Sequence, residues 1–292
     1  MTPFPPTPNL ADLNKLAKLA AKILSDPQIK YCSDKEQIQS VFGWSTNYSK
    51  KIMLRLAVID GFYSTQMNRR LFGLEEVEME LQRAGANNDE TFANAAAGFI
   101  HAPSNESCVL KLLQKNYGRN KKGDDRRKAA SLITKYLYYV TEFKFPIYDN
   151  LVRDSYNRIL KMCNGVQLQK MKDECDVQFF KNLIELKSLS RIDTFDSLDN
   201  LLWILGKIRK GSLSAIVPND TYKQILGKKG VPKGRGATSK RIDDAVARLL
   251  RKEGMHQEFA RLLGDDFMTL VEFTGKLPQR KSRRKHANRK KA

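Results

Sequence analysis

Residues 126–160 have the sequence RRKAASLITKYLYYVTEFKFPIYDNLVRDSYNRIL, and this stretch decides the fold. Apolar residues at helical spacing fill both of its halves, so we predict a helix on each side of a short turn. Asp149 lies at the entry of the second helix, with Lys128 and Lys135 upstream of it. An aspartate in this place is either a helix N-cap or a catalytic carboxylate. The rest of the sequence has to decide between these two interpretations.

The composition indicates a globular protein with an anionic partner. The chain has 292 residues, of which 41% are hydrophobic, and this is enough for a substantial core. Lysine and arginine total 52 against 32 acidic residues, for a formal net charge of +20. Such a charge favours nucleic acid as the partner. The alternative is a ribosome-associated protein, or one that is merely basic.

Neither a membrane span nor a metal site is expected. No apolar run reaches the roughly 18 residues that a membrane helix needs, and the Pro-rich start differs from a signal peptide, so we expect a cytoplasmic protein. The cysteines are widely separated and form no ligand motif: Cys32, Cys108, Cys163 and Cys175. The histidines are equally scattered: His101, His256 and His286. We therefore predict reduced, structural cysteines and no cofactor.

Helical periodicity dominates the chain up to residue 217. We expect helices starting at Ser33, from its capping pattern SDKE, and near Asn88, and a long helix that runs through residues 50–72. The predicted organisation is a helical core over residues 1–217, with its central segment at 118–160. A basic loop and C-terminal helices follow over 218–278, and a disordered basic tail occupies 279–292.

Two basic stretches near the C-terminus favour contacts with phosphate groups. The tail QRKSRRKHANRKKA carries eight basic residues, and its alternative role is to keep the protein soluble. The connector GKKGVPKGRG, at residues 227–236, contains Lys233 and Arg235. It matches no phosphate-loop pattern, so we expect a mobile basic loop instead of a nucleotide site. Neither stretch can supply chemistry.

Chemistry therefore has to come from the central segment. Breaking a glycosidic bond in DNA places positive charge on the sugar, and one nearby carboxylate can stabilise that charge or activate water. A lysine within reach could add covalent attack on the sugar, followed by strand cleavage. The target base must also leave the stack, and another side chain then fills the gap.

Three segments resemble helix-hairpin-helix DNA glycosylases. DNLVRDSYNRIL, at 149–160, resembles the segment that begins at their catalytic aspartate, and RRKAASLITKYLYY, at 126–139, resembles the helix before it. VIDGFYSTQMNRRLFG, at 58–73, is similar to a helix of the oxoguanine-type branch that carries lesion-probing polar residues. The wider pattern, including LDNLLWILGKIRKG, resembles bacterial proteins of an oxoguanine-glycosylase-like fold, some of which act against phages with modified DNA.

The resemblance assigns roles to individual residues. It implies that Asp149 is the catalytic aspartate, that Lys128 lies at the helix start where the family lysine lies, and that Lys135 is the other lysine candidate. The family's glycine hairpin is replaced here by NYGRNKKGDDRRK, at residues 116–128, which favours a glycosylase without lyase activity. Side-chain charge would then replace backbone contacts to phosphate, from Lys121, Lys122, Arg126 and Arg127.

The resemblance also implies DNA contacts from Gln66, Asn68 and Arg69, with Gln66 or Asn68 holding the opened duplex. The prediction is an all-α fold of two helical subdomains with a DNA-binding groove between them and Asp149 at its floor. The predicted protein is a monomer that excises a damaged or modified base from double-stranded DNA, without a cofactor. The alternative is a non-catalytic DNA- or RNA-binding protein on the same scaffold.

Overall fold

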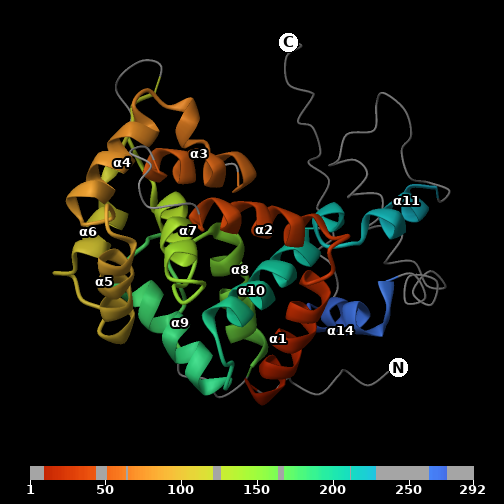
Figure 1. The fold of residues 1–292 in the computed structure, drawn as a ribbon. Coiled ribbons are helices and arrows are strands. Elements are labelled where there is room, and N and C mark those ends of the chain that lie inside the picture. The colour runs from red at the N-terminus through yellow and green to blue at the C-terminus, as the bar shows by residue number, and fades with distance from the viewer. Residues whose placement is uncertain are drawn as a thin grey trace, which may run out of the picture.

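A computed structural model describes residues 10–43, 51–63, 65–120, 126–163, 168–210, 212–227 and 263–274. The fold is mainly helical, so the predicted all-α class is confirmed at this level (Figure 1). Four residues in two short strands form the only sheet within these ranges. The predicted C-terminal helices and the basic tail lie almost wholly outside the described residues.

The helices are as follows in chain order: α1 (Leu10–Leu24), α2 (Lys30–Phe42), α3 (Lys51–Tyr63), η1 (Met67–Arg69), α4 (Gly73–Arg83), α5 (Asp89–His101), α6 (Cys108–Gln114), α7 (Ala130–Val140), α8 (Asn150–Met162), α9 (Val177–Leu189), α10 (Phe195–Lys210), η2 (Leu213–Ala215), α11 (Asn219–Gly227) and α14 (Asp265–Phe273). The strands are β1 (Asn116–Tyr117) and β2 (Arg127–Lys128).

Helix α7 lies at the centre of the molecule. Nine of its eleven residues are buried, as expected for a helix that is apolar on almost every side. Helices α2, α3, α5 and α6 pack against it (Figure 1). Its buried face includes two polar side chains, Thr134 and Lys135. Burial of a charged group is costly without a partner, so the buried Lys135 requires a carboxylate or a hydrogen-bond acceptor nearby.

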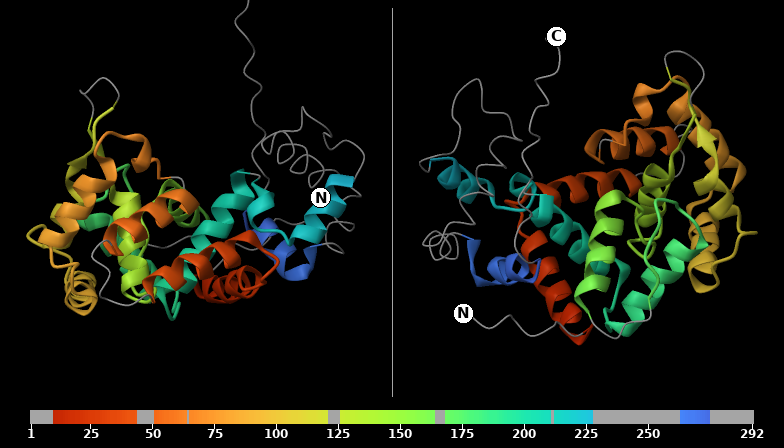
Figure 2. Two further views of the ribbon diagram at one scale, coloured as in Figure 1. Left: turned by 45° about the horizontal axis from the view of Figure 1, so that its top comes forward. Right: turned by 180° about the vertical axis from the view of Figure 1, so that it is seen from behind.

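A second group of helices packs around α10. Helix α1 lies along α10 and α14, and α10 lies beside α8 (Figure 2). The approach of α8 and α10 is close because residue 206 is glycine. A Cβ atom there would stand 3.0 Å from Leu151 Cδ2 and 3.1 Å from Ser155 Oγ. This contact fixes the first two turns of α8, and with them the helix entry at Asp149.

Strands β1 and β2 form an antiparallel arm with Asn116 opposite Lys128. The arm is fastened to the segment before α4, because Leu71 and Arg119 exchange backbone hydrogen bonds of 3.0 and 2.9 Å. Gly118 has a φ of +57°, and a Cβ atom there would lie 2.8 Å from Gly73 Cα. Glycine is therefore required for this close backbone contact.

Two predicted helix boundaries are wrong. Helix α2 begins at Lys30 instead of Ser33, with no side-chain cap. Helix α3 ends at Tyr63, so the predicted continuation through residue 72 is a loop and a short 3₁₀ turn. By contrast, the predicted start near Asn88 is confirmed, since the Asn88 side chain accepts a hydrogen bond from Thr91 N at 2.9 Å.

Candidate functional site

The buried lysine of α7 faces the aspartate at the start of α8. Lys135 Nζ lies 3.9 Å from Asp149 Oδ2, and their side chains are 4% and 19% exposed. Nζ also donates a hydrogen bond of 2.7 Å to Ser131 Oγ, one turn earlier on α7. The two candidate residues, 14 positions apart in sequence, are therefore brought together by the turn between α7 and α8.

Asp149 is both a cap and half of an ion pair. Its Oδ1 accepts a hydrogen bond of 2.9 Å from Val152 N, which caps α8. Its Oδ2 is the oxygen that faces Lys135. The backbone before it is held as well, since Tyr148 N donates to Thr134 Oγ1 at 3.0 Å. The helix-cap interpretation is therefore confirmed, and the catalytic interpretation stays a prediction.

One tyrosine ring covers the Lys135 ammonium group, and a second tyrosine is hydrogen-bonded to the first. Lys135 Nζ lies 5.0 Å from the centre of the Tyr63 ring, within the range of a cation–π contact. The Tyr63 hydroxyl shares a hydrogen bond of 2.9 Å with that of Tyr139. Ser131, Asp149 and Tyr63 together cover the ammonium group. Of the pair, only the carboxylate therefore keeps appreciable contact with solvent.

A third ionisable group, Asp199 of α10, lies close enough to influence both members of the pair. Burial lowers the pKa of Lys135, whereas Asp149 and Asp199 act to raise it. Burial raises the pKa of Asp199 well above its ordinary range, and the charges of Asp149 and Asp196 raise it further. Asp199 therefore holds a proton more readily than an exposed aspartate does.

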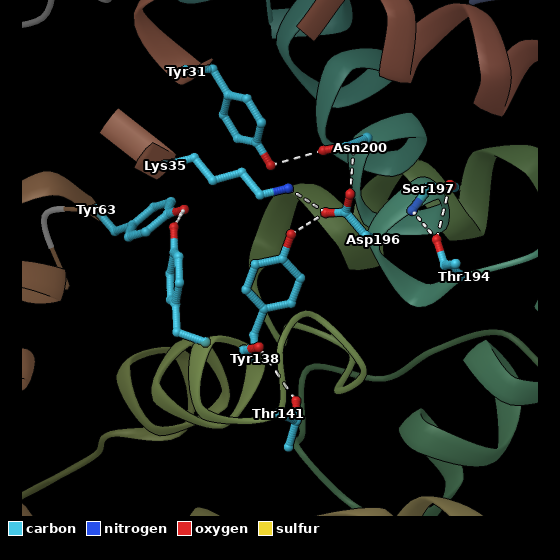
Figure 3. A network of polar contacts seen from close by, with 10 residues as sticks. Tyr31, Lys35, Tyr63, Tyr138, Thr141, Thr194, Asp196, Ser197 and Asn200 are labelled. Atoms are coloured by element: carbon cyan, nitrogen blue, oxygen red, sulfur yellow. Dashed lines mark hydrogen bonds and ion pairs between the residues drawn. The ribbon is translucent and has the colours of Figure 1, made fainter. Parts of the chain in front are cut away.

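A separate polar network ties α2, α7 and α10 together beside this pair (Figure 3). Asp196 accepts hydrogen bonds from Lys35 Nζ at 2.5 Å, from Asn200 Nδ2 at 3.3 Å and from the Tyr138 hydroxyl. The Tyr31 hydroxyl donates to Asn200 Oδ1 at 2.9 Å. Because one carboxylate accepts hydrogen bonds from donors on three helices, we assign this network a structural role: it holds α2, α7 and α10 together.

The segment after α3 is a tightly held, exposed loop. The buried carboxylate of Asp60 accepts hydrogen bonds from Met67 N at 2.9 Å and Asn68 N at 3.1 Å. Gln66 has a φ of +66°, in the left-handed region that non-glycine residues rarely adopt. Gln66, Asn68 and Arg69 are all exposed. The loop leaves α3 at Tyr63, the residue that contacts Lys135.

Sequence reasoning missed two apolar side chains at the end of this loop. Leu71 and Phe72 are 51% and 62% exposed, and Phe72 has a φ of +57°. A bulky aromatic residue in a left-handed conformation on the surface is uncommon, and such strain often marks a functional segment. Hydrophobic periodicity does not reveal this conformation, because it predicts a helix through residue 72.

Three predicted cationic site residues lie on the surface in or beside the arm: Arg126, Arg127 and Lys128. Lys128 lies on β2, two residues before α7 and not at the helix start itself, and it is exposed like Arg127. Arg126 Nη2 pairs with Glu76 Oε1 at 2.8 Å, so the Glu76 carboxylate partly neutralises the charge of Arg126. Four predicted phosphate contacts lie outside the described residues: Lys121, Lys122, Lys233 and Arg235.

Searches against protein-family models, curated proteins and solved structures find no match to this chain. Within the described ranges, His, Cys, Asp and Glu side chains form no cluster of three or more that could hold a metal ion. In the same part of the chain, every helix is too short or too polar to cross a membrane. The geometry around Asp149 is therefore the basis for any functional proposal.

Proposed function

We propose that the protein is a DNA glycosylase that hydrolyses the N-glycosidic bond of a damaged or modified base. The supporting observation is the pairing of a partly exposed carboxylate, Asp149, with a buried lysine, Lys135, at the N-terminus of α8. Both residues lie in the segments that resemble helix-hairpin-helix glycosylases. In this proposal the helices form two subdomains, and the DNA lies in the groove between them.

Asp149 acts on the sugar. As the base departs with its bonding electrons, positive charge develops on the sugar ring, and the Asp149 carboxylate stabilises it. Water then attacks the anomeric carbon and loses a proton, and the departing base gains one, which leaves an abasic site. The Lys135 cation at 3.9 Å positions Oδ2, and the hydrogen bond from Val152 N holds Oδ1 at the helix N-terminus.

Lys135 is a positioning residue in this mechanism. Its ammonium group is covered by Ser131, Asp149 and Tyr63, so it is badly placed to attack a sugar carbon. Lys128, the other lysine candidate, is exposed on β2. We therefore propose base excision without lyase activity. Borohydride trapping of a covalent protein–DNA adduct would contradict this part of the proposal.

The exposed loop opens the duplex. Phe72, held in a left-handed conformation and largely exposed, inserts into the gap that the extruded base leaves, and Gln66 or Asn68 contacts the bases around it. Arg69, Arg127 and Lys128 add phosphate contacts, as do the four cations outside the described residues. The left-handed backbone presents Phe72 on the surface before DNA binds, so insertion needs little rearrangement of the loop.

The decisive test measures abasic sites in genomic DNA from several phages, including phages with heavily modified bases. Asp149→Asn should lower the yield about 100-fold or more, because an amide cannot stabilise the developing charge. Asp176→Asn is the matched control, since Asp176 caps α9 in the same way, accepting from Phe179 N at 2.8 Å. Asparagine is a good N-cap, so both variants should fold.

Two results would remove the enzyme proposal. One is the absence of abasic sites on every DNA tested, and the other is an equal yield from Asp149→Asn and the wild type. Binding that depends only on salt concentration would then favour the nucleic-acid-binding alternative. For biology we propose defence against phages with modified DNA. Expression in a host should reduce plaques of modified phages and spare unmodified ones, and Asp149→Asn should abolish the difference.

A further inference from the structure

A basic recess lies at the end of α8 opposite Asp149. Its volume is about 360 Å³, within the range of small-ligand sites. Arg158 and Lys161 from α8, Lys170 from the following segment and Arg209 from α10 line it, with Thr274 and two further residues of α8, Asp154 and Asn157. Arg158 and Lys161 come about 14 and 18 Å after Asp149 along the axis of α8, so these cations lie well away from the carboxylate.

The positive charge of the recess is not balanced by the protein around it. Four of its side chains are cationic and only one, Asp154, is a carboxylate. Asp154 is already paired with Arg153, whose Nη2 lies 3.3 Å from Oδ1. Arg158, Lys161 and Lys170 are exposed and make no ion pair with any other residue that the structure describes. Like charges held together in this way attract an anion.

The walls of the recess are fixed before any ligand arrives. The Asn157 side chain donates to Met171 O at 3.0 Å and accepts from Met171 N at 2.8 Å, which anchors the segment that carries Lys170. Arg209 Nη1 donates to Asp154 O at 3.3 Å and joins α10 to α8. Little backbone ordering therefore opposes binding.

The helix dipole accounts for the positions of only two of the four cations in the recess. Cations are favourable in the last turn of a helix, and Lys161 and Arg209 occupy the last turns of α8 and α10. Arg158 lies a turn earlier, and Lys170 lies outside any helix. These two residues have no such role, and they complete the convergence of positive charge.

We propose that this recess binds phosphate groups at a site distinct from Asp149. The ligand chemistry is a phosphate oxyanion held by arginine and lysine side chains. Two sources could supply it: the backbone of a DNA duplex that extends past the Asp149 site, or a free phosphate compound of low molecular mass. The proposal does not depend on catalysis by Asp149.

The test uses the full-length protein and the double variant Arg158→Gln/Lys170→Gln. The matched control, Lys30→Gln/Lys181→Gln, removes two exposed lysines that lie outside the recess. The probes are an unmodified duplex of 30 base pairs and inorganic pyrophosphate. Far-ultraviolet circular dichroism checks that both variants keep the fold.

If the source is DNA, the recess variant binds the 30-base-pair duplex at least about 10-fold more weakly than the control does. Its log–log salt dependence should also become less steep by about 2, since each lost phosphate contact removes about 0.9 from the slope. If the source is a small phosphate compound, pyrophosphate binding by calorimetry is lost in the recess variant alone, and duplex binding matches the control. The recess proposal is wrong if the two variants agree with both probes.

Discussion

At the scale of single residues, Lys135 and Asp149 act as a unit. Lys135→Met should lower the rate of single-turnover excision about 10-fold, because the carboxylate loses the cation that positions its Oδ2. Lys135→Arg keeps a cation beside the carboxylate and should restore much of the rate. Single-turnover excision by the wild type and both variants provides the check. Equal rates for Lys135→Met and the wild type would mean that the lysine has only a packing role.

Asp199 makes stability depend on pH. Its pKa is raised in the folded protein, so it stabilises the fold below its unfolded pKa, about 3.9, and this contribution is lost as the pH rises through the folded value. Asparagine stays neutral throughout. Asp199→Asn should therefore raise the free energy of unfolding at pH 7, and the gain should vanish near pH 3.5. Urea unfolding at both pH values measures it, and a gain that does not depend on pH would contradict the assignment.

At the scale of elements, the arm and the loop before α4 depend on glycine. Gly118→Ala should destabilise the protein by about 1–2 kcal/mol, because of its positive φ and its contact with Gly73. Gly98→Ala is the matched control, since the site is helical and a Cβ there would meet no atom within 4 Å beyond the local helix backbone. That change should stabilise by about 0.5–1 kcal/mol. Thermal unfolding should therefore give opposite signs, and equal signs would argue against the close contact.

The exposed loop has its own test. Phe72→Ala should weaken base extrusion about 10-fold, because stacking of an aromatic ring on a base contributes about 1–3 kcal/mol. Met79→Ala, on α4, removes another exposed apolar side chain and should leave extrusion unchanged. The fluorescence of 2-aminopurine beside the target base reports the step. Equal signals from the two variants would exclude Phe72 as the inserted residue.

At the scale of the whole molecule, much of the helical pattern was predictable from sequence. Apolar residues at helical spacing identified α7 and α8, and the Asn88 cap identified α5. Local patterns were less reliable at Ser33 and beyond Tyr63. There, burial of Tyr31 and the hydrogen bonds of Asp60 override the local signal.

The sequence predicted which residues belong to the candidate site, but not how they are arranged in space. Asp149 was visible as a polar residue before a helix, but its distance from Lys135 depends on how the turn folds. The basic recess was not visible at all, because Lys170 and Arg209 meet only when α10 packs on α8. Phe72 was assigned to a helix, and its exposure comes from a left-handed backbone that no periodicity encodes.

The burial of α7 bears on how the chain acquires its site during synthesis. Helices earlier in the sequence cover one part of α7, and Asp149 and Asp196, which are made later, contact Lys135 and Tyr138. A chain that ends at residue 140 would leave Lys135 without its carboxylate partner and expose the apolar surface of α7. We therefore expect the described core to fold as one cooperative unit, only after α10 has left the ribosome. A nascent chain would then lack the Lys135–Asp149 pair until translation of the core is complete.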